Sequence, residues 1–362
     1  MMDWQDKVNL KTLEIAFDQN CNLACSYCSP TCSTMWQNDI RKNGAYQNLV
    51  SDNAQYQQNS TWDMSYGKHI FNAFFKSWES DLQYTLEELR VSGGEPPLAK
   101  DFWRLLDWWQ SNKDCNVRLS VTSNLGLEPE LIQKLVDATH SFKHFNLYTS
   151  NESFGAQAEY IRDGLVWDTW LGNIHKFLQE GNVRELHMLM TINALCLFSI
   201  TDFMDEMIRL KETYGQFVPI MSLDILSMPS FQSPASLPTD IKEQLADNLE
   251  NWLENVGKKH ELFLDREHDG VNKLINYLRE VQVEHQHTSS IETRERDFKS
   301  FYTQYDIRRN KSFENTFPEN VVNWYKSIPS QVQKSVDVKS HDLETVRASM
   351  INNITRNYQP ED

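Results

Sequence analysis

The chain has 362 residues, of which 40% are hydrophobic and 24% charged, a balance typical of a globular protein rather than a disordered one. Its formal net charge is −16, whereas proteins that grip nucleic acid through phosphates usually present a basic face. We find neither a membrane-length apolar run nor a basic, apolar leader at the first residues. We therefore expect a cytoplasmic protein that contacts no membrane and does not have nucleic acid as its partner.

The first two thirds of the chain alternates short β-type runs with longer helical patterns, which predicts parallel β/α units. The expected strands are Thr12–Asp18, Glu88–Ser92, Val117–Ser123, His144–Ser150, Leu186–Asn193 and Phe217–Ile225. The expected helices between them are Gly67–Ser80, Lys100–Gln110, Glu128–Ala138, Trp167–Glu180 and Ile200–Tyr214, with Asp101 and Thr201 as caps or first-turn residues. Six such units predict an α/β fold, a partial (β/α)6 TIM-like barrel rather than a closed one of eight strands.

Changes in composition divide the chain into three expected parts. Residues 1–230 form the barrel, with a polar insertion at 33–65 that we expect to be irregular or short-helical. After a loop punctuated by prolines at Ser227–Pro238, residues 231–330 form a helical extension and residues 331–362 a polar tail. The expected helices of the extension are Thr239–Val256, Val271–Val283 and Glu292–Tyr305.

Four of the six cysteines lie within twelve residues, in the segment CNLACSYCSPTC that follows the first expected strand. Without an export signal, such a cluster indicates metal or redox chemistry rather than disulfides. Cys21, Cys25 and Cys28 can bind three corners of a 4Fe-4S cluster and leave the fourth iron open to a cofactor. The alternatives are a structural zinc site with Cys32 as its fourth ligand, or cysteines that bind no metal.

Polar or glycine-rich segments follow the next strands at the edge where barrel active sites gather. The second strand runs into SGGEP at Ser92–Pro96, and the third ends in Thr122, Ser123 and Asn124, whose hydroxyl and amide groups suit a ribose or a carboxylate. Both segments also have the composition of ordinary turns.

The fourth expected strand ends at Ser150, and Arg162 follows twelve residues later. The planar fork of an arginine suits a carboxylate ligand, but a surface ion pair with Glu159 or Asp163 is an equal alternative. The fifth strand runs into Asn193–Cys196. Cys196 either faces the cavity, as a hydrogen-atom donor or a reductant of a substrate radical, or is a small buried hydrophobe.

Two candidates lie in the C-terminal region. His285 and His287 do not have the spacing of a helical metal site, so we expect them to be solvated. The segment Asp306–Asn310, DIRRN, either pairs among the C-terminal helices or closes over the barrel mouth.

The segment CNLACSYC resembles the cluster motif of the radical S-adenosylmethionine (radical SAM) superfamily, with Tyr27 in the aromatic position, and SGGEP resembles its GGEP motif. The resemblance covers residues from about 10 to 226 and implies one 4Fe-4S cluster with S-adenosylmethionine as a second cofactor. It implies the following cofactor-binding residues: Tyr27, Gly93, Gly94, Glu95, Pro96, Ser123, Asn124, Ser150, Arg162 and Leu195. In particular, Gly93, Gly94 and Glu95 would meet the methionine ammonium, Ser150 and Arg162 the hydroxyls and the carboxylate, and Leu195 the adenine.

The resemblance also implies the reaction. An electron from flavodoxin or ferredoxin would cleave S-adenosylmethionine to a 5′-deoxyadenosyl radical, which abstracts a hydrogen atom from a substrate. A peptide is the expected substrate, a small metabolite or nucleotide is the alternative, and a non-catalytic iron–sulfur or zinc protein is the rival class. The stretch ILSMPSFQSPASLP resembles environmental and phage maturase-like members, but no cysteine follows Cys196. We therefore expect an oxidoreductase or maturase without the twitch or SPASM set of auxiliary-cluster cysteines.

Overall fold

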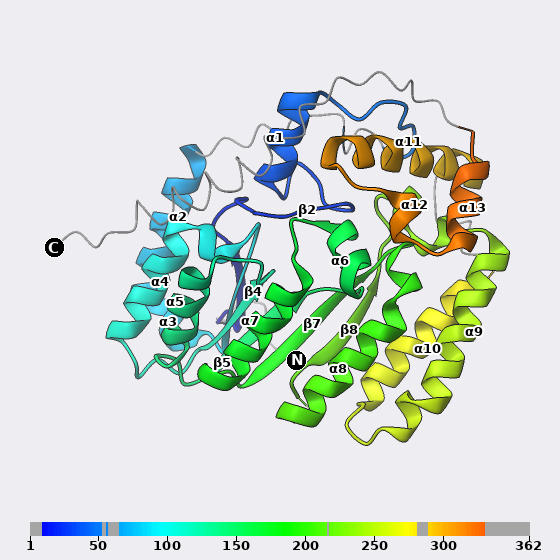
Figure 1. Cartoon of the computed structure of the whole chain (residues 1–362). Helices are drawn as coiled ribbons and strands as arrows, with labels where there is room; N and C mark the ends of the chain where they lie inside the picture. The colour runs from blue at the N-terminus through cyan, green and yellow to red at the C-terminus, as the bar shows by residue number, and fades with distance from the viewer. Residues whose placement is uncertain (1–8, 53–55, 57–64, 216, 281–288, 330–362) are drawn as a thin grey trace, which may run out of the picture.

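The computed structural model describes residues 9–52, 56, 65–215, 217–280 and 289–329 (Figure 1). Six strands form one sheet in the order β1-β3-β4-β5-β7-β8, and every neighbouring pair is parallel. The strands are β1 Thr12–Ala16, β3 Glu88–Ser92, β4 Arg118–Ser123, β5 Phe145–Ser150, β7 Glu185–Ile192 and β8 Ile220–Ile225. The predicted partial (β/α)6 barrel is therefore confirmed, with β1 and β8 at the two ends of the sheet.

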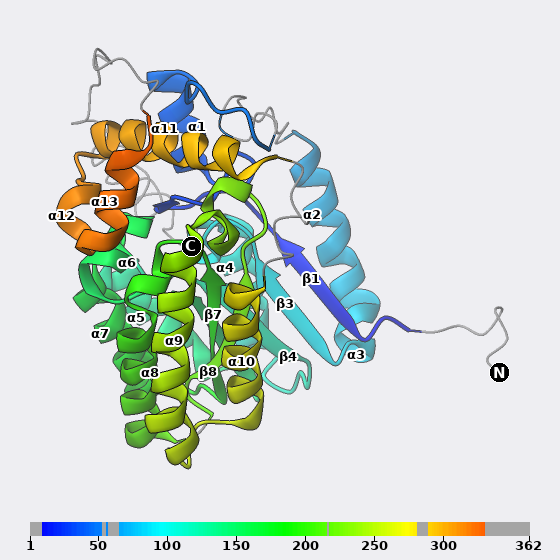
Figure 2. The same ribbon diagram turned by 90° about the vertical axis from the view of Figure 1, so that its right-hand side faces the viewer.

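Side chains alternate along the central strands between an apolar and a polar face. Leu89, Val91, Leu119 and Val121 are fully buried, and the residues between them, such as Arg90, are polar. Helices connect the parallel strands and cover one face of the sheet, as Figures 1 and 2 show. They are α2 Ser65–Ser77, α3 Gln83–Thr85, α4 Lys100–Ser111, α5 Pro129–Thr139, α7 Trp167–Glu180 and α8 Ile200–Tyr214, with a π-helical turn at Trp78–Leu82 between α2 and α3.

Several expected boundaries are shifted. The sixth strand begins at Ile220 rather than Phe217, after the cis-proline Pro219, and the helix expected at Gly67–Ser80 ends at Ser77 and continues as the π-helical turn. Asp101 and Thr201 are first-turn residues, because α4 and α8 start one residue before them.

The insertion after β1 contains a regular helix, α1 Thr34–Asn43, where we expected irregular or short-helical structure. Met35, Trp36, Asp39 and Ile40 are buried at helical spacing, so one face of α1 packs inward although the segment is polar overall. Residues 53–55 and 57–64 of the insertion lie outside the described residues.

The C-terminal region is helical as predicted, with α9 Thr239–Asn255, α10 Asp265–Arg279, α11 Ile291–Arg309, α12 Phe313–Thr316 and α13 Glu319–Ser327. Helix α10 packs against β8 and α9. A fully buried ion pair joins it to α8, since Lys211 Nζ lies 2.9 Å from Glu267 Oε2. His285, His287 and the polar tail at 331–362 fall outside the described residues. Within the described residues, no helix is both long and apolar enough to cross a membrane.

Helices α1 and α11 lie across the end of the sheet at which the strands terminate (Figure 2). Arg309 at the end of α11 joins them, because its guanidinium is 3.2 Å from Asp39 of α1 and 3.2 Å from Asp163. Arg308 donates to the carbonyl oxygen of Gly44 at 2.9 Å. The DIRRN segment therefore combines features of both predicted arrangements: its arginines contact α1 and Asp163 near the strand ends, and Asp306 accepts a hydrogen bond from Phe313 N–H of α12 at 2.8 Å.

Candidate active site

A two-stranded antiparallel ribbon positions the middle cysteine of the triad. Strand β2, Ala24–Cys25, pairs with β6, Arg162–Asp163, so that Cys25 lies opposite Arg162. The N–H of Ser26 donates to the carbonyl oxygen of Ile161 at 2.7 Å and extends the pairing by one bond. Strands of two residues have no detectable periodicity, so the sequence did not predict this ribbon or the helix α6, Gly155–Ile161, that precedes β6.

Side chains from distant parts of the chain hold the carbonyl groups of this loop. Trp36 of α1 donates its indole N–H to the carbonyl oxygen of Cys25 at 2.9 Å. Tyr56 and Gln232 both donate to the carbonyl oxygen of Ser26, at 2.8 and 2.9 Å. The loop that carries the thiols is therefore fixed by the insertion after β1 and by the loop after β8.

The thiols of the triad are half-buried, and that of Cys32 is exposed. Burial raises the pKa of Cys21 to about 12, and it also raises the pKa of Cys25, against the opposing charge of Arg162. The Cys28 thiol donates a hydrogen bond to Cys32, which raises the pKa of Cys28 and lowers that of Cys32 to about 5. A bound cation stabilises the thiolate form of such buried groups.

No group of three or more His, Cys, Asp or Glu side chains among the described residues converges closely enough to hold a single metal ion. The thiolates of a cubane cluster bind separate irons, so they need to surround the cluster rather than converge on one point. The short C-x3-C-x2-C loop, with its half-buried thiols, fits a ligand set of this kind.

The SGGEP turn packs directly on the backbone that leads into the first cysteine. Gly94 N–H donates to Asp18 O at 3.1 Å, and Glu95 N–H donates to Asn20 O at 2.6 Å. A Cβ atom on Gly94 would lie 2.3 Å from Asn20 O, and one on Gly93, whose φ is +123°, would lie 2.6 Å from Asp18 O. Glycine is therefore required at both positions by the approach of two chain segments.

Glu95 links this turn to the end of β4. Its carboxylate is 2% exposed and accepts hydrogen bonds from the Ser123 hydroxyl at 2.5 Å and from Asn124 N–H at 2.7 Å. Burial raises the pKa of Glu95 to about 7. The Asn124 side-chain amide in turn lies 3.8 Å from the Cys21 sulfur, and Pro96 is buried at the start of a 3₁₀ turn. Predicted residues from three strand ends thus meet at the first cysteine.

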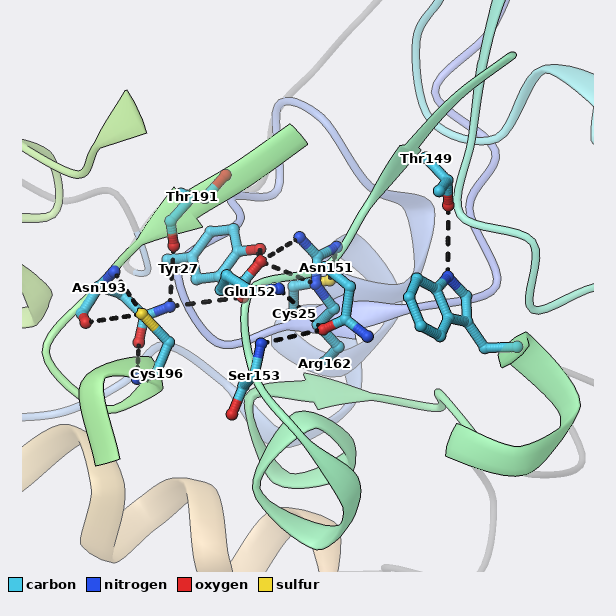
Figure 3. Close-up of polar contacts among 11 residues, drawn as sticks. Cys25, Tyr27, Thr149, Asn151, Glu152, Ser153, Arg162, Thr191, Asn193 and Cys196 are labelled. Carbon is cyan, nitrogen blue, oxygen red and sulfur yellow. Dashed lines mark hydrogen bonds and ion pairs between the residues drawn. The ribbon is translucent and has the colours of Figure 1, made fainter. Parts of the chain in front are cut away.

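Arg162 forms a buried ion pair that the sequence did not reveal (Figure 3). Its Nη2 and Nε lie 2.6 and 3.2 Å from Glu152 Oε2, and its Nη1 lies 3.8 Å from the Cys25 sulfur. Glu152 also accepts from the Tyr27 hydroxyl at 3.1 Å. The predicted surface ion pair of Arg162 with Glu159 or Asp163 is therefore wrong, because Arg162 is 4% exposed and faces Glu152. The only feature of the sequence that could have marked Glu152 as a site residue is its position two residues after Ser150, at the end of β5.

The strand ends of β5 and β7 complete the surroundings (Figure 3). Ser150 is half-buried, and the Asn151 side chain next to it is fully buried, with an Nδ2 that has no partner among the described residues. Leu195 and Cys196 are also fully buried. The Cys196 thiol donates to Asn193 O at 3.1 Å, and the Asn193 side chain accepts from Leu195 N–H and Cys196 N–H at 3.0 and 3.1 Å. The buried amide donor of Asn151 fits a ligand that supplies an oxygen acceptor.

No protein-family model matches the chain, and no curated protein matches it. Among solved structures it is similar to Streptococcus suis SuiB bound to S-adenosylmethionine, at 12% identity and a TM-score of 0.41, over 67% of this chain and 47% of that one. It is also similar to anSMEcpe with bound AdoMet and the Cp18Cys peptide, at 16% identity and a TM-score of 0.40, over 67% and 59%. A third match is TYW1 with a lysine-pyruvate adduct, at 14% identity and a TM-score of 0.35, over 68% and 74%. The aligned part is about half the length of the SuiB chain.

Proposed function

We propose that the chain is a radical S-adenosylmethionine enzyme and that Cys21, Cys25 and Cys28 hold its 4Fe-4S cluster. The observation that carries the proposal is the loop of three thiols at the C-terminal end of β1, in contact with the SGGEP turn on one side and with Arg162 on the other. Parallel barrels place their active sites at this end of the strands. When bound, the cluster and S-adenosylmethionine would supply reductive cleavage to a 5′-deoxyadenosyl radical.

The residues around the loop suit the second cofactor. Glu95 presents a buried carboxylate for the methionine ammonium, and burial together with a cationic partner strengthens such a bond. The buried Asn151 amide donor, beside Ser150, suits a ribose hydroxyl or a carboxylate oxygen. Helices α1 and α11 cover the strand ends and limit the access of water to this region.

We propose a peptide as the substrate to test first, supported by the sequence resemblance to maturase-like members, with a small metabolite or nucleotide as the alternative. Flavodoxin or ferredoxin is the proposed electron donor, and the cytoplasm the proposed compartment. Cys196 is a proposed hydrogen-atom donor only if substrate opens its surroundings, because its thiol is fully buried.

The test is anaerobic reconstitution with iron and sulfide, followed by incubation with dithionite and S-adenosylmethionine. We expect about four irons per chain and formation of 5′-deoxyadenosine. Cys25→Ala removes one ligand and should abolish both, whereas Cys115→Ala is the matched control, since Cys115 is a half-buried cysteine outside the loop. Full iron content and cofactor cleavage in Cys25→Ala would contradict the proposal.

A second candidate is a structural site of four thiolates without turnover. The hydrogen bond between Cys28 and Cys32 brings a fourth thiol to the triad, and these described side chains would have to draw closer together to hold one zinc ion. In that case the protein would bind one zinc ion, remain colourless, and lose its metal in Cys32→Ala. In the radical enzyme, Cys32→Ala should retain its iron.

A further inference from the structure

We propose that Arg162 is a positioning residue for the cluster: it acts through the Cys25 sulfur and raises the reduction potential of the cluster. The inference rests on the proposed function, because it requires an iron–sulfur cluster at the triad. It goes beyond that function by assigning Arg162 and Glu152 a joint role.

Strand pairing fixes the position of the Arg162 backbone relative to Cys25. Arg162 lies opposite Cys25 in the β2–β6 ribbon, so the distance between their Cα atoms is set by strand pairing rather than by a flexible loop. The Arg162 side chain is 5% exposed and that of Glu152 is not exposed at all. The Tyr27 ring lies 5.5 Å from the guanidinium carbon and adds an aromatic contact.

Glu152 holds one edge of the Arg162 guanidinium. Two of the three guanidinium nitrogens, Nε and Nη2, point at the same carboxylate oxygen, at 3.2 and 2.6 Å. The third, Nη1, points at the Cys25 sulfur at 3.8 Å. Because the protein's own carboxylate holds the Nε/Nη2 edge, the guanidinium is fixed in an orientation that directs Nη1 at the sulfur.

A hydrogen bond to a cluster sulfur stabilises the reduced form, because reduction adds negative charge to the cluster. The effect is large where the pair is shielded from water. Glu152 offsets the charge of the guanidinium, so the donor directed at Cys25 is the main local influence. Arg162→Lys keeps the positive charge and the partner Glu152, but it loses the planar fork that aims Nη1 at the sulfur.

The experiment compares Arg162→Lys with Arg309→Lys as a matched control. Arg309 is also a buried arginine, and its guanidinium hydrogen-bonds the carboxylates of Asp39 and Asp163 rather than a cysteine. Each protein is reconstituted anaerobically, its iron and sulfide are counted, and the midpoint potential of the cluster is measured by an EPR-monitored redox titration. A double variant, Glu152→Gln with Arg162→Gln, removes both charges together.

We expect R162K to keep its cluster and to lower the equilibrium constant for reduction about tenfold, which lowers the midpoint potential by about 59 mV for one electron. R309K should keep the wild-type potential. An unchanged potential in a cluster-bearing R162K overturns the inference. Loss of the cluster in both R162K and the double variant, with R309K intact, also overturns it, because Arg162 would then hold the loop instead of tuning the cluster. A wild-type protein that binds no cluster refutes the proposed function itself, which is a separate outcome.

Discussion

Gly94→Ala tests whether the SGGEP turn must touch the cysteine loop. The added Cβ would lie 2.3 Å from Asn20 O and 2.6 Å from Gln19 O, and both atoms belong to the backbone that enters Cys21. Neither atom is the end of a flexible side chain, so the backbone has to move by about 1 Å to restore an ordinary contact. Overpacking of this kind costs about 1–3 kcal/mol. The movement would weaken the hydrogen bonds that Gly94 N–H and Glu95 N–H donate to the carbonyl oxygens of Asp18 and Asn20.

The matched control is Gly172→Ala. Gly172 is an exposed residue inside α7, and nothing lies within 4 Å of its added Cβ. Alanine there should stabilise the helix by roughly 1 kcal/mol, because it removes the helix-breaking tendency of glycine. The two substitutions add the same methyl group and should change the stability in opposite directions.

Both variants are compared with wild type by urea unfolding of the cluster-free protein, under reducing and anaerobic conditions, and by iron content after reconstitution. We expect Gly94→Ala to lower the free energy of unfolding by about 1–3 kcal/mol and to bind less iron. If it matches wild type in both measurements while Gly172→Ala behaves as expected, the close approach of the two segments does not constrain the site.

Three further predictions concern buried polar groups. Lys211→Met leaves the buried Glu267 without its cationic partner and should lower the free energy of unfolding in urea by about 3–5 kcal/mol. The double variant Lys211→Met with Glu267→Gln should regain part of that loss. A loss below about 1 kcal/mol in the single variant would mean that the ion pair does not offset the burial of the Glu267 charge. Burial raises the pKa of Glu95 from 4.5 to about 7, so the folded state keeps a proton that the unfolded state releases. In the absence of S-adenosylmethionine, wild type should therefore lose up to about 3 kcal/mol of stability relative to Glu95→Gln as the pH rises from about 4.5 through 7. A difference in stability between the two proteins that does not vary with pH would contradict this. Tyr302→Phe removes the hydroxyl that lies 3.0 Å from Gln232 Oε1 and 3.4 Å from the hydroxyl of Ser26. Calorimetry should show that the free energy of unfolding falls by about 1–3 kcal/mol. An unchanged melting temperature would mean that α11 does not support the cysteine loop.

The parallel barrel was predictable because its elements carry strong periodicity. The expected bounds of Glu88–Ser92, Trp167–Glu180 and Ile200–Tyr214 agree with the structure. Amphipathic helices and alternating strands of this length specify their own faces. Helix α1 was expected only as one of two alternatives, irregular or short-helical, because only a narrow stripe of its polar segment is buried. That stripe packs against Tyr46 and Tyr56 of the same insertion and also against α11, which is remote in sequence and which no local pattern reveals.

Part of the candidate site could likewise be predicted from the sequence and part could not. The triad and the strand-end motifs were recognisable because spacing and chain order mark them. The partner of Arg162 was not, because the only carboxylates that the sequence offered as partners were its near neighbours Glu159 and Asp163. Instead α6 and the β2–β6 ribbon turn the chain back, so that Arg162 meets Glu152 at the end of β5. Asp163 pairs with Arg309 of α11, a contact between elements far apart in sequence.

The central claim is that three thiolates hold a cluster whose remaining iron is open to S-adenosylmethionine. The most direct measurement is the EPR spectrum of the anaerobically reconstituted and dithionite-reduced protein, recorded before and after S-adenosylmethionine is added. We predict the signal of a reduced 4Fe-4S cluster, and a clear change of that signal when the cofactor binds its open iron. A cluster signal that S-adenosylmethionine leaves unchanged, or a protein that takes up zinc and gives no cluster signal, would contradict the claim.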